Sequence, residues 1–544
     1  MDSQWSWSGL LRDWRGKDET GMTAVIFSTN GSVRVTNSRL PTAFLRPALL
    51  VTTLLAAPAM AAGPAEDATR AAIARVQRID PLINAVISLD PTAIAQARQV
   101  DASGLRGPMV GVPVLIKDNI EAMGPLPTTA GSLALIDNVT NRDAPLVARL
   151  RASGAVILGK TNLSEWANIR SSHSISGWSA VGGQTRNPHA LDRNPCGSSS
   201  GSGAAVAAGE VDFAIGTETD GSITCPAAVN GVVGFKPTVG MVSRSRIVPI
   251  SASQDTAGPI TRTVQQAAML LSVIAGSDPT DPATREADAH RANFAAALST
   301  NSLRGARIGV MRFAAGFGTD AQFDAALAVL KAQGATLVEI KSFDDKAIGG
   351  NETKVLHAEL KAGLNAYLAT TPPSVTARTL ADVIAFNTAH AGQEMALFGQ
   401  ETFVEAQKTK GLADPAYKLA RATSLAAAGV NGIDRMLKAN RLDALVGPTM
   451  PPSWKIDAVN GDQISGGGAG SLAAVAGYPH LTVSMGAVRG LPVGLSFMGA
   501  KWSDAKILSL GFAYEQASRA LVVPRFPRSI EETPEVAPLM GRQR

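Results

Sequence analysis

Serine and lysine are the residue types of this 544-residue chain whose spacing could attack a carbonyl group. A serine hydroxyl attacks an unactivated amide only when a base within hydrogen-bond reach removes its proton and nearby donors stabilise the oxyanion. Histidine is the usual base, but none of the six histidines lies in a segment that pairs it with a serine-containing turn. We therefore expect the histidines to occupy surface or loop positions.

Lys117 is the candidate base. It ends the apolar segment GVPVLIK (111–117), so its side chain would emerge from a buried strand, and burial disfavours the charged form of an amine. A lysine that is neutral near pH 7 can replace histidine beside a serine nucleophile. A lone lysine at a strand end is more often a solvated cap, so its position alone does not assign this role.

A second serine pattern competes for the role of nucleophile. Residues 197–201 read GSSSG and fit the G-x-S-x-G elbow of the α/β-hydrolases, with Ser199 in the nucleophile position. That elbow needs a strand that runs straight into the turn, whereas the preceding LDRNPC (191–196) holds a proline and several polar or charged residues. We therefore interpret the match as a chance feature of a serine-rich loop.

Several segments, taken together and in order, resemble the amidase signature family. They are GVPVLIKDN (111–119), LGKTNLSEWAN (158–168), CGSSSGSGAAVAAG (196–209) and GTETDGSITCPAAVNGVVGFKPT (216–238). The 24-residue separation of Ser198 and Ser222 also matches the Ser-Ser-Lys triad of that family. The resemblance implies that Lys117 is the base, that Ser198, whose peptide bond the family holds in cis, is the proton shuttle, and that Ser222 is the nucleophile.

The same resemblance implies an oxyanion hole made by consecutive backbone N–H groups. In this chain those groups belong to Thr219, Asp220, Gly221 and Ser222. The commonest form of the motif in the family is Asp-x-Gly-Gly-Ser, whereas residues 218–222 read ETDGS, so Asp220 replaces a glycine. The backbone donors survive this replacement, but the local charge and the geometry of the turn differ.

That departure, together with PCGSSSGS (195–202) and VSRSRIVPISASQDTAGP (242–259), resembles the bacterial peptide amidases within the family. Segments at 385–401, 411–417 and 490–499 agree with them. The resemblance implies a serine amidohydrolase that converts the C-terminal carboxamide of peptide amides, or related linear amides, to acid and ammonia without metal or cofactor. The alternatives are an acylamidase for anilides or other small amides, an aminoacyl-tRNA amidotransferase subunit, and a non-catalytic exported binding protein.

Four further residues stand close to the triad in the sequence. Cys196 and Cys225 each lie near one of its serines, and we expect them to pack rather than react, although a single disulfide between them is an open alternative. Asn119 and Asp255 could support the triad through hydrogen bonds or be ordinary turn residues. The segment TTAGS (128–132) is expected to form a loop over the site.

Apolar periodicity predicts an α/β protein. The predicted helices cover 66–79 and 144–154, and the predicted strands cover 111–117, 155–160, 211–218, 231–238, 306–311 and 442–448. A surface or site loop is predicted over 182–203, and a mostly helical insertion over 350–440. The family resemblance implies the amidase signature fold, a large twisted mixed β-sheet surrounded by helices.

The first 61 residues carry an apolar segment typical of an export signal. ALLVTTLLAA (48–57) follows two arginines and precedes Ala59-Met60-Ala61, a small-x-small site for signal peptidase. We expect an N-terminal extension over 1–61 and one amidase domain over 62–544, in a periplasmic or secreted protein. The signal begins deep in the chain, so a start at Met22, or an ordinary apolar helix in a cytoplasmic protein, is an open alternative.

Composition argues against several other classes of protein. No segment reaches the roughly 18 consecutive apolar residues of a membrane-spanning helix, so no integral membrane segment is expected. The net charge of +5 is small for this length and comes without Lys/Arg runs, so nucleic acid is not an expected partner. The glycines at 466–470 lack the strand and helix of a phosphate-binding loop, and no Cys/His set has zinc-ligand spacing. The expected partner is a peptide amide or another small amide substrate.

Overall fold

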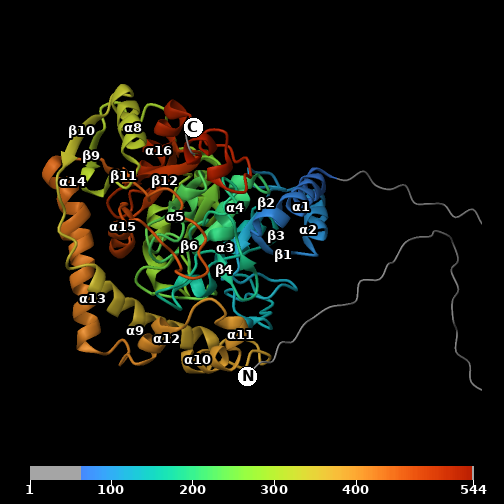
Figure 1. Cartoon of the computed structure of the whole chain (residues 1–544). Coiled ribbons are helices and arrows are strands. Elements are labelled where there is room, and N and C mark those ends of the chain that lie inside the picture. The colour runs from blue at the N-terminus through green and yellow to red at the C-terminus, as the bar shows by residue number, and fades with distance from the viewer. Residues whose placement is uncertain (1–62, 542–544) are drawn as a thin grey trace, which may run out of the picture. The chain divides into compact units, whose positions relative to one another are not determined.

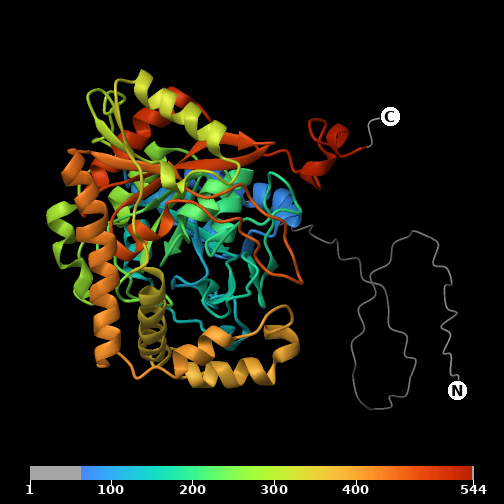
Figure 2. The same ribbon diagram turned by 60° about the vertical axis from the view of Figure 1, so that its left-hand side comes forward.

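The computed structural model describes residues 63–541, whose centre is an eleven-stranded mixed β-sheet (Figures 1 and 2). The strand order is β1-β3-β2-β6-β8-β7-β12-β13-β11-β9-β10. The strands are β1 (Val86–Leu89), β2 (Pro113–Lys117), β3 (Val156–Thr161), β6 (Phe213–Glu218), β7 (Val233–Lys236), β8 (Thr256–Thr261), β9 (Arg307–Met311), β10 (Thr336–Ile340), β11 (Ala444–Pro448), β12 (His480–Val488) and β13 (Leu491–Met498). β4 (Trp178–Ser179) and β5 (Gly183–Gln184) form a separate two-stranded sheet. The predicted large mixed sheet is confirmed.

Helices cover both faces of this sheet. On one face, α3 (Pro145–Ala152), α6 (Val264–Ile274), α8 (Asp320–Ala332) and α16 (Asp504–Ser518) share an apolar cluster with Val114 and Ile116 of β2. On the other, α1 (Pro64–Ile83), α2 (Ala93–Ser103) and α4 (Ser200–Ala208) pack with Leu115 of the same strand. The alternation follows from the two-residue period of a strand, and it buries β2 on both sides. Outside residues 349–440, the other α-helices of the described chain are α5 (Thr224–Val229), α7 (Ala287–His290), α15 (Gly470–Ala476) and α17 (Ala537–Met540).

Parallel pairing brings the chemically important strand ends together. β2 pairs in parallel with β3 and β6, so the carboxyl ends of these three strands lie at the same edge of the sheet. β9 also pairs in parallel with β10 and β11, whereas the other pairs of the large sheet are antiparallel. Lys117 ends β2 and Glu218 ends β6, which places the expected base beside the segment that leads to Ser222.

Most of the predicted surface or site loop over 182–203 is irregular, but its serine-rich end is buried and runs into a helix. Helix α4 begins at Ser200, inside the predicted loop, and residues 198–202 are inaccessible to solvent. A Cβ on Gly201 would lie 2.1 Å from the carbonyl oxygen of Ala85, so only glycine allows α4 to approach the backbone this closely. The small residues that suggested a flexible surface loop therefore serve close packing.

The predicted helical insertion over 350–440 is confirmed. It contains α9 (Gly349–Leu368), α10 (Leu380–Ala389), α11 (Ala391–Glu394), α12 (Glu401–Gln407), α13 (Pro415–Ala428) and α14 (Arg435–Asn440), which lie together at the left and bottom of Figure 1. Side chains of α9, α10 and α12 form an apolar cluster with Ala130. The segment 128–132 is thus buried beneath the insertion, where Thr128 and Thr129 bind Lys160 and Asp118, and the prediction of a loop over the site was wrong.

The residues that carry the expected export signal, 1–61, lie outside the described part of the chain. Within residues 63–541, no helix has the length and apolar character needed to cross a membrane.

Candidate active site

Lys117 lies inside the protein and contacts one of the expected catalytic serines. Its side chain is inaccessible to solvent, and its Nζ lies 2.7 Å from Ser198 Oγ and 2.9 Å from Thr217 Oγ1. Burial lowers the pKa of the Lys117 amine to about 7, against the opposing effect of the Asp255 and Glu218 carboxylates. A neutral amine at this distance from a hydroxyl can accept its proton.

Thr217 is a further residue of this arrangement, and sequence reasoning missed it. Its Oγ1 accepts hydrogen bonds from Lys117 Nζ and, at 3.0 Å, from Asn119 Nδ2. Asn119 therefore supports the lysine through Thr217, in line with one of the two interpretations of this residue. Thr217 lies on β6 directly beside the parallel strand β2, and only the strand register could have identified it.

Ser198 follows a cis peptide bond from Gly197, as the family resemblance implied. Its side chain is fully buried, and its carbonyl oxygen accepts a hydrogen bond from the Ser164 amide. The next residue, Ser199, donates its amide to the carbonyl oxygen of Ser222 at 3.1 Å. This bond joins the two serine segments, so Ser198 and Ser222 belong to one local structure.

Ser199 itself has no access to a substrate. Its Oγ donates to the carbonyl oxygen of Thr217 and accepts from the amide of the same residue, each at 3.1 Å, and its side chain is fully buried. A hydroxyl that bridges two backbone groups is a structural group. The interpretation of GSSSG as a chance match to the hydrolase elbow agrees with this position.

The turn that carries Ser222 is closed by Glu218. Oε2 of Glu218 accepts hydrogen bonds from the amides of Ile223 and Thr224, at 2.7 and 2.9 Å, at the start of α5. Gly221 adopts φ of +79°, and no neighbouring atom would meet an added Cβ, so the left-handed backbone is what favours glycine here. Glu218 was missed as a positioning residue, although an acidic side chain just before a short helix was a usable signal.

The expected oxyanion donors are free to receive a ligand. Within the described residues, the N–H groups of Thr219, Asp220, Gly221 and Ser222 donate to no protein acceptor. Such groups are costly to bury without a partner, but they are well suited to a developing negative charge. The turn therefore offers several adjacent donors beside Ser222.

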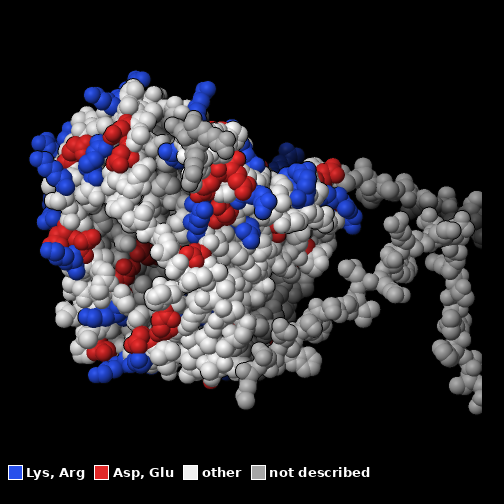
Figure 3. All heavy atoms as spheres, viewed as in Figure 1, with Lys and Arg blue, Asp and Glu red and all other residues white. Residues whose placement is uncertain are grey.

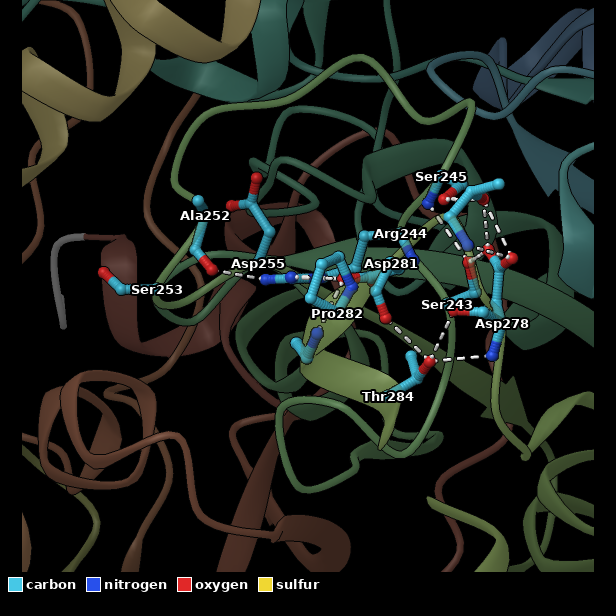
Figure 4. A network of polar contacts seen from close by, with 12 residues as sticks. Ser243, Arg244, Ser245, Ala252, Ser253, Asp255, Asp278, Asp281, Pro282 and Thr284 are labelled. Carbon is cyan, nitrogen blue, oxygen red and sulfur yellow. Dashed lines mark hydrogen bonds and ion pairs between the residues drawn. The ribbon is translucent and has the colours of Figure 1, made fainter. Parts of the chain in front are cut away.

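Asp255 holds the first residue of this turn. Its Oδ1 accepts a hydrogen bond from Thr219 Oγ1 at 2.6 Å, and its Oδ2 accepts the amides of Ile250 and Ser251, each at 2.8 Å. Its loop is fixed in turn by Arg244, which lies between Asp281 and the carbonyl oxygen of Ala252 (Figure 4). Asp255 thus acts as a supporting residue, one of the two alternatives that its sequence position allowed.

The cysteines form a disulfide, Cys196–Cys225, which is the alternative that the sequence left open. The bridge connects the chain just before Ser198 to α5, just after Ser222. Both residues are almost fully buried and pack with Val229 and Trp454. The disulfide therefore fixes the two serine segments to each other by a covalent bond.

Replacing both cysteines with alanine is expected to lower the free energy of unfolding by about 3 kcal/mol, because the bridge closes a loop whose ends are 29 residues apart. Thermal unfolding of the purified proteins measures this change. Reductant should lower the Tm of the wild type and leave that of the double variant unchanged. Two titratable thiols in the unreduced, denatured wild-type chain would contradict the bridge.

His480 contradicts the expectation of surface or loop positions because it lies in strand β12, whereas His189 lies in a turn, as expected. His189 and His480 are buried, with Nε2 hydrogen-bonded to the carbonyl oxygen of Asn230 and to Ser496 Oγ, respectively. Burial lowers their pKa values to about 4 and about 3, so both are neutral near pH 7. Neither lines the cavity beside the serines.

A cavity of about 670 Å³ opens beside the two serine segments. Gly197 and Gly221, which precede Ser198 and Ser222, form part of its wall, together with the two cysteines. Its acidic lining residues are Asp220, Asp345, Glu352 and Asp462, and its larger apolar ones are Phe313, Phe317, Phe343, Met450, Ile464 and Leu472. Figure 3 shows acidic side chains inside a hollow on this face. Gly467 and Gly468, which were expected to be simple loop residues, also line the cavity.

The sequence matches the profile of the Amidase family over residues 67–508. The chain belongs to the amidase signature family. It is therefore an amide-hydrolysing enzyme, and the mixed sheet surrounded by helices is the fold of that family.

Known amidases and a related amidotransferase are similar over most of this chain. A probable amidase of Arabidopsis thaliana is 40% identical over 466 residues, which cover 83% of this chain and 86% of that protein. The crystal structure of the native peptide amidase from Stenotrophomonas maltophilia is 50% identical with a TM-score of 0.80, and the match covers 85% of this chain and 95% of that one. One subunit of the glutamyl-tRNA(Gln) amidotransferase of Symbiobacterium thermophilum is 34% identical over 482 residues, 84% of this chain and 94% of that protein.

Proposed function

We propose that this amidase hydrolyses the C-terminal carboxamide of peptide amides to the free acid and ammonia. Ser222 acts as nucleophile, Ser198 as proton shuttle and Lys117 as base. The observation that carries the proposal is the buried contact of 2.7 Å between Lys117 Nζ and Ser198 Oγ, because it joins a lysine with lowered pKa to a serine whose neighbour, Ser199, is hydrogen-bonded to Ser222.

In the acylation step, Ser222 Oγ forms a bond to the carbonyl carbon of the amide. Its proton passes to Ser198 Oγ as the proton of Ser198 passes to Lys117 Nζ. The carbonyl oxygen becomes an oxyanion and receives hydrogen bonds from the unpartnered amides of residues 219–222. The C–N bond then breaks, the nitrogen takes a proton back along the same path, and ammonia leaves.

In the deacylation step, water attacks the Ser222 ester. Lys117 removes the water proton through Ser198, and the tetrahedral intermediate collapses with return of a proton to Ser222 Oγ. The products of the whole cycle are one acid and one ammonia for each amide and water consumed. The three side chains end in their starting protonation states.

The cavity supports a peptide substrate. At about 670 Å³ it has the size of a site for a ligand of several residues, and its wall includes Gly197 and Gly221, the residues next to the two serines where a C-terminal amide would have to lie. A small primary amide would leave most of this volume unfilled. The similarity to the Stenotrophomonas maltophilia peptide amidase supports the same substrate class.

A panel of amides tests the proposed substrate. Ammonia release from acetylated dipeptide amides should exceed amine or ammonia release from anilides and fatty amides, because only the dipeptides fill the cavity next to the serines. The matched control is each dipeptide as its free acid, which contains no terminal carboxamide and should yield no ammonia. Faster cleavage of anilides would instead establish an acylamidase.

A further inference from the structure

Two carboxylates from distant parts of the chain meet in the wall of the substrate cavity. Glu352 lies in the first turns of α9, and Asp220 lies in the turn before Ser222. No lysine, arginine or histidine is among the residues that line the cavity in the described chain. The buried Lys236 at the end of β7 lowers the pKa of Asp220 by its positive charge, but it does not line the cavity.

Glu352 is nearly buried and has an unused acceptor. Its residue exposure is 8%, and Oε1 accepts a hydrogen bond of 2.8 Å from Gln254 Nε2, while Oε2 accepts none from residues 63–541. Asp220 is similar, because Oδ2 accepts from Ser471 Oγ at 3.0 Å and Oδ1 accepts from no described residue. Each carboxylate therefore presents one free oxygen in a cavity that holds no cationic side chain.

The two carboxylates also affect each other. Burial raises the pKa of Asp220 well above its usual value, and the negative charge of Glu352 raises it further. Burial likewise raises the pKa of Glu352. A positively charged ligand group between them would favour the ionised forms, since opposite charge lowers the pKa of a carboxyl group.

We propose that Glu352 and Asp220 bind a positively charged nitrogen of the substrate, upstream of the carboxamide that is cleaved. The nitrogen belongs either to the free α-amino terminus of a short peptide or to a lysine or arginine side chain. The aromatic rings of Phe313, Phe317 and Phe343 in the same wall suit a cation, because the faces of such rings attract positive charge. This inference rests on the proposed function and names the class of peptide amide that the site prefers.

Equilibrium binding to the Ser222→Ala variant tests the inference without turnover. Calorimetry compares acetyl-Lys-Phe amide with acetyl-Gln-Phe amide to test a positively charged side-chain nitrogen. It compares Ala-Phe amide with acetyl-Ala-Phe amide to test a positively charged α-amino group. In at least one pair the cationic peptide should bind about tenfold more tightly, the effect of one added charged hydrogen bond. Equal Kd values within both pairs would overturn the inference.

A charge-neutral substitution identifies the residue responsible. Adding Glu352→Gln should reduce the preference for the cationic peptide to less than threefold, whereas Glu405→Gln, an exposed residue of α12 outside the cavity, should leave it unchanged. Asp220→Asn, which removes the charge of the other carboxylate of the pair, provides a second variant if Glu352→Gln does not fold. A full preference retained in these variants would also overturn the inference.

The outcome separates this inference from the proposed function. Preferential binding of cationic peptides without ammonia release by the wild type would leave the cation site standing and remove the peptide amidase activity. Ammonia release from all four peptide amides, with equal Kd values within both pairs, would support the peptide amidase activity and remove the cation site.

Discussion

Ser222→Ala is expected to lower kcat for ammonia release from a peptide amide by about 10⁴-fold or more, because it removes the hydroxyl that we propose as nucleophile, at the end of the turn whose amides, residues 219–222, are unpartnered in the described chain. Ammonia release under saturating substrate measures the loss. A fluorophosphonate probe should label the wild type and not the variant, because the probe reacts with an activated serine hydroxyl.

Ser199→Ala is the matched control for this experiment. Ser199 lies in the other serine segment, and its Oγ bonds only to the backbone of Thr217, so the variant should still be labelled by the probe. Loss of labelling in Ser199→Ala with retained labelling in Ser222→Ala would move the nucleophile to Ser199 and restore the α/β-hydrolase interpretation.

Lys117→Ala is expected to reduce kcat by about 10²- to 10⁴-fold, the usual contribution of a positioned general base. The variant removes the amine that lies 2.7 Å from Ser198 Oγ and leaves Ser222 in place. Steady-state ammonia release measures the effect. A variant within a factor of two of the wild type would remove lysine from the mechanism.

Lys160→Met provides the control for loss of a buried lysine. Lys160 lies on the neighbouring strand β3 and is as buried as Lys117, but its Nζ binds Asp118, Thr128 and the carbonyl oxygen of Ile120 instead of a serine. We expect this variant to lose thermal stability and to keep kcat within about tenfold of the wild type. A loss equal to that of Lys117→Ala would show that burial, and not base chemistry, explains both effects.

The pH profile provides a second readout for Lys117. Because the pKa of the Lys117 amine is about 7, the amine is protonated and inactive as a base at lower pH. We therefore expect kcat/KM to rise as the pH increases through about 7 and then to level off. In Lys117→Ala the residual activity should not show this rise. A wild-type profile that is flat between pH 6 and 8 would contradict a lysine base with this pKa.

The sequence was most informative where local motifs carry the chemistry. The resemblance to the amidase signature family, carried by the motifs around Lys117, Ser198 and Ser222, predicted that these residues belong to one site, whereas the position of Lys117 at a strand end did not assign its role. Thr217 could not be found in this way, since it reaches Lys117 only through the register of two parallel strands. Glu352 lies in a helical insertion without a motif, and only the folded chain places it beside Asp220.

The predictions that were wrong have a common physical cause. Residues 198–202 have the composition of a flexible loop, yet they are buried because small side chains permit close backbone approach. His480 is polar, yet it is buried in β12 with a hydrogen-bond partner. Composition measures average polarity, whereas burial depends on whether each polar atom finds a partner.

The disulfide between Cys196 and Cys225 makes the shape of the cavity depend on where the chain folds. A chain that folds in a reducing cytosol has two thiols in the cavity wall, whereas a chain that folds under oxidising conditions has a disulfide bond there. Recombinant preparations from reducing and oxidising hosts are therefore chemically different proteins at the substrate wall. Their kinetic constants are comparable only when the oxidation state of these two cysteines has been established.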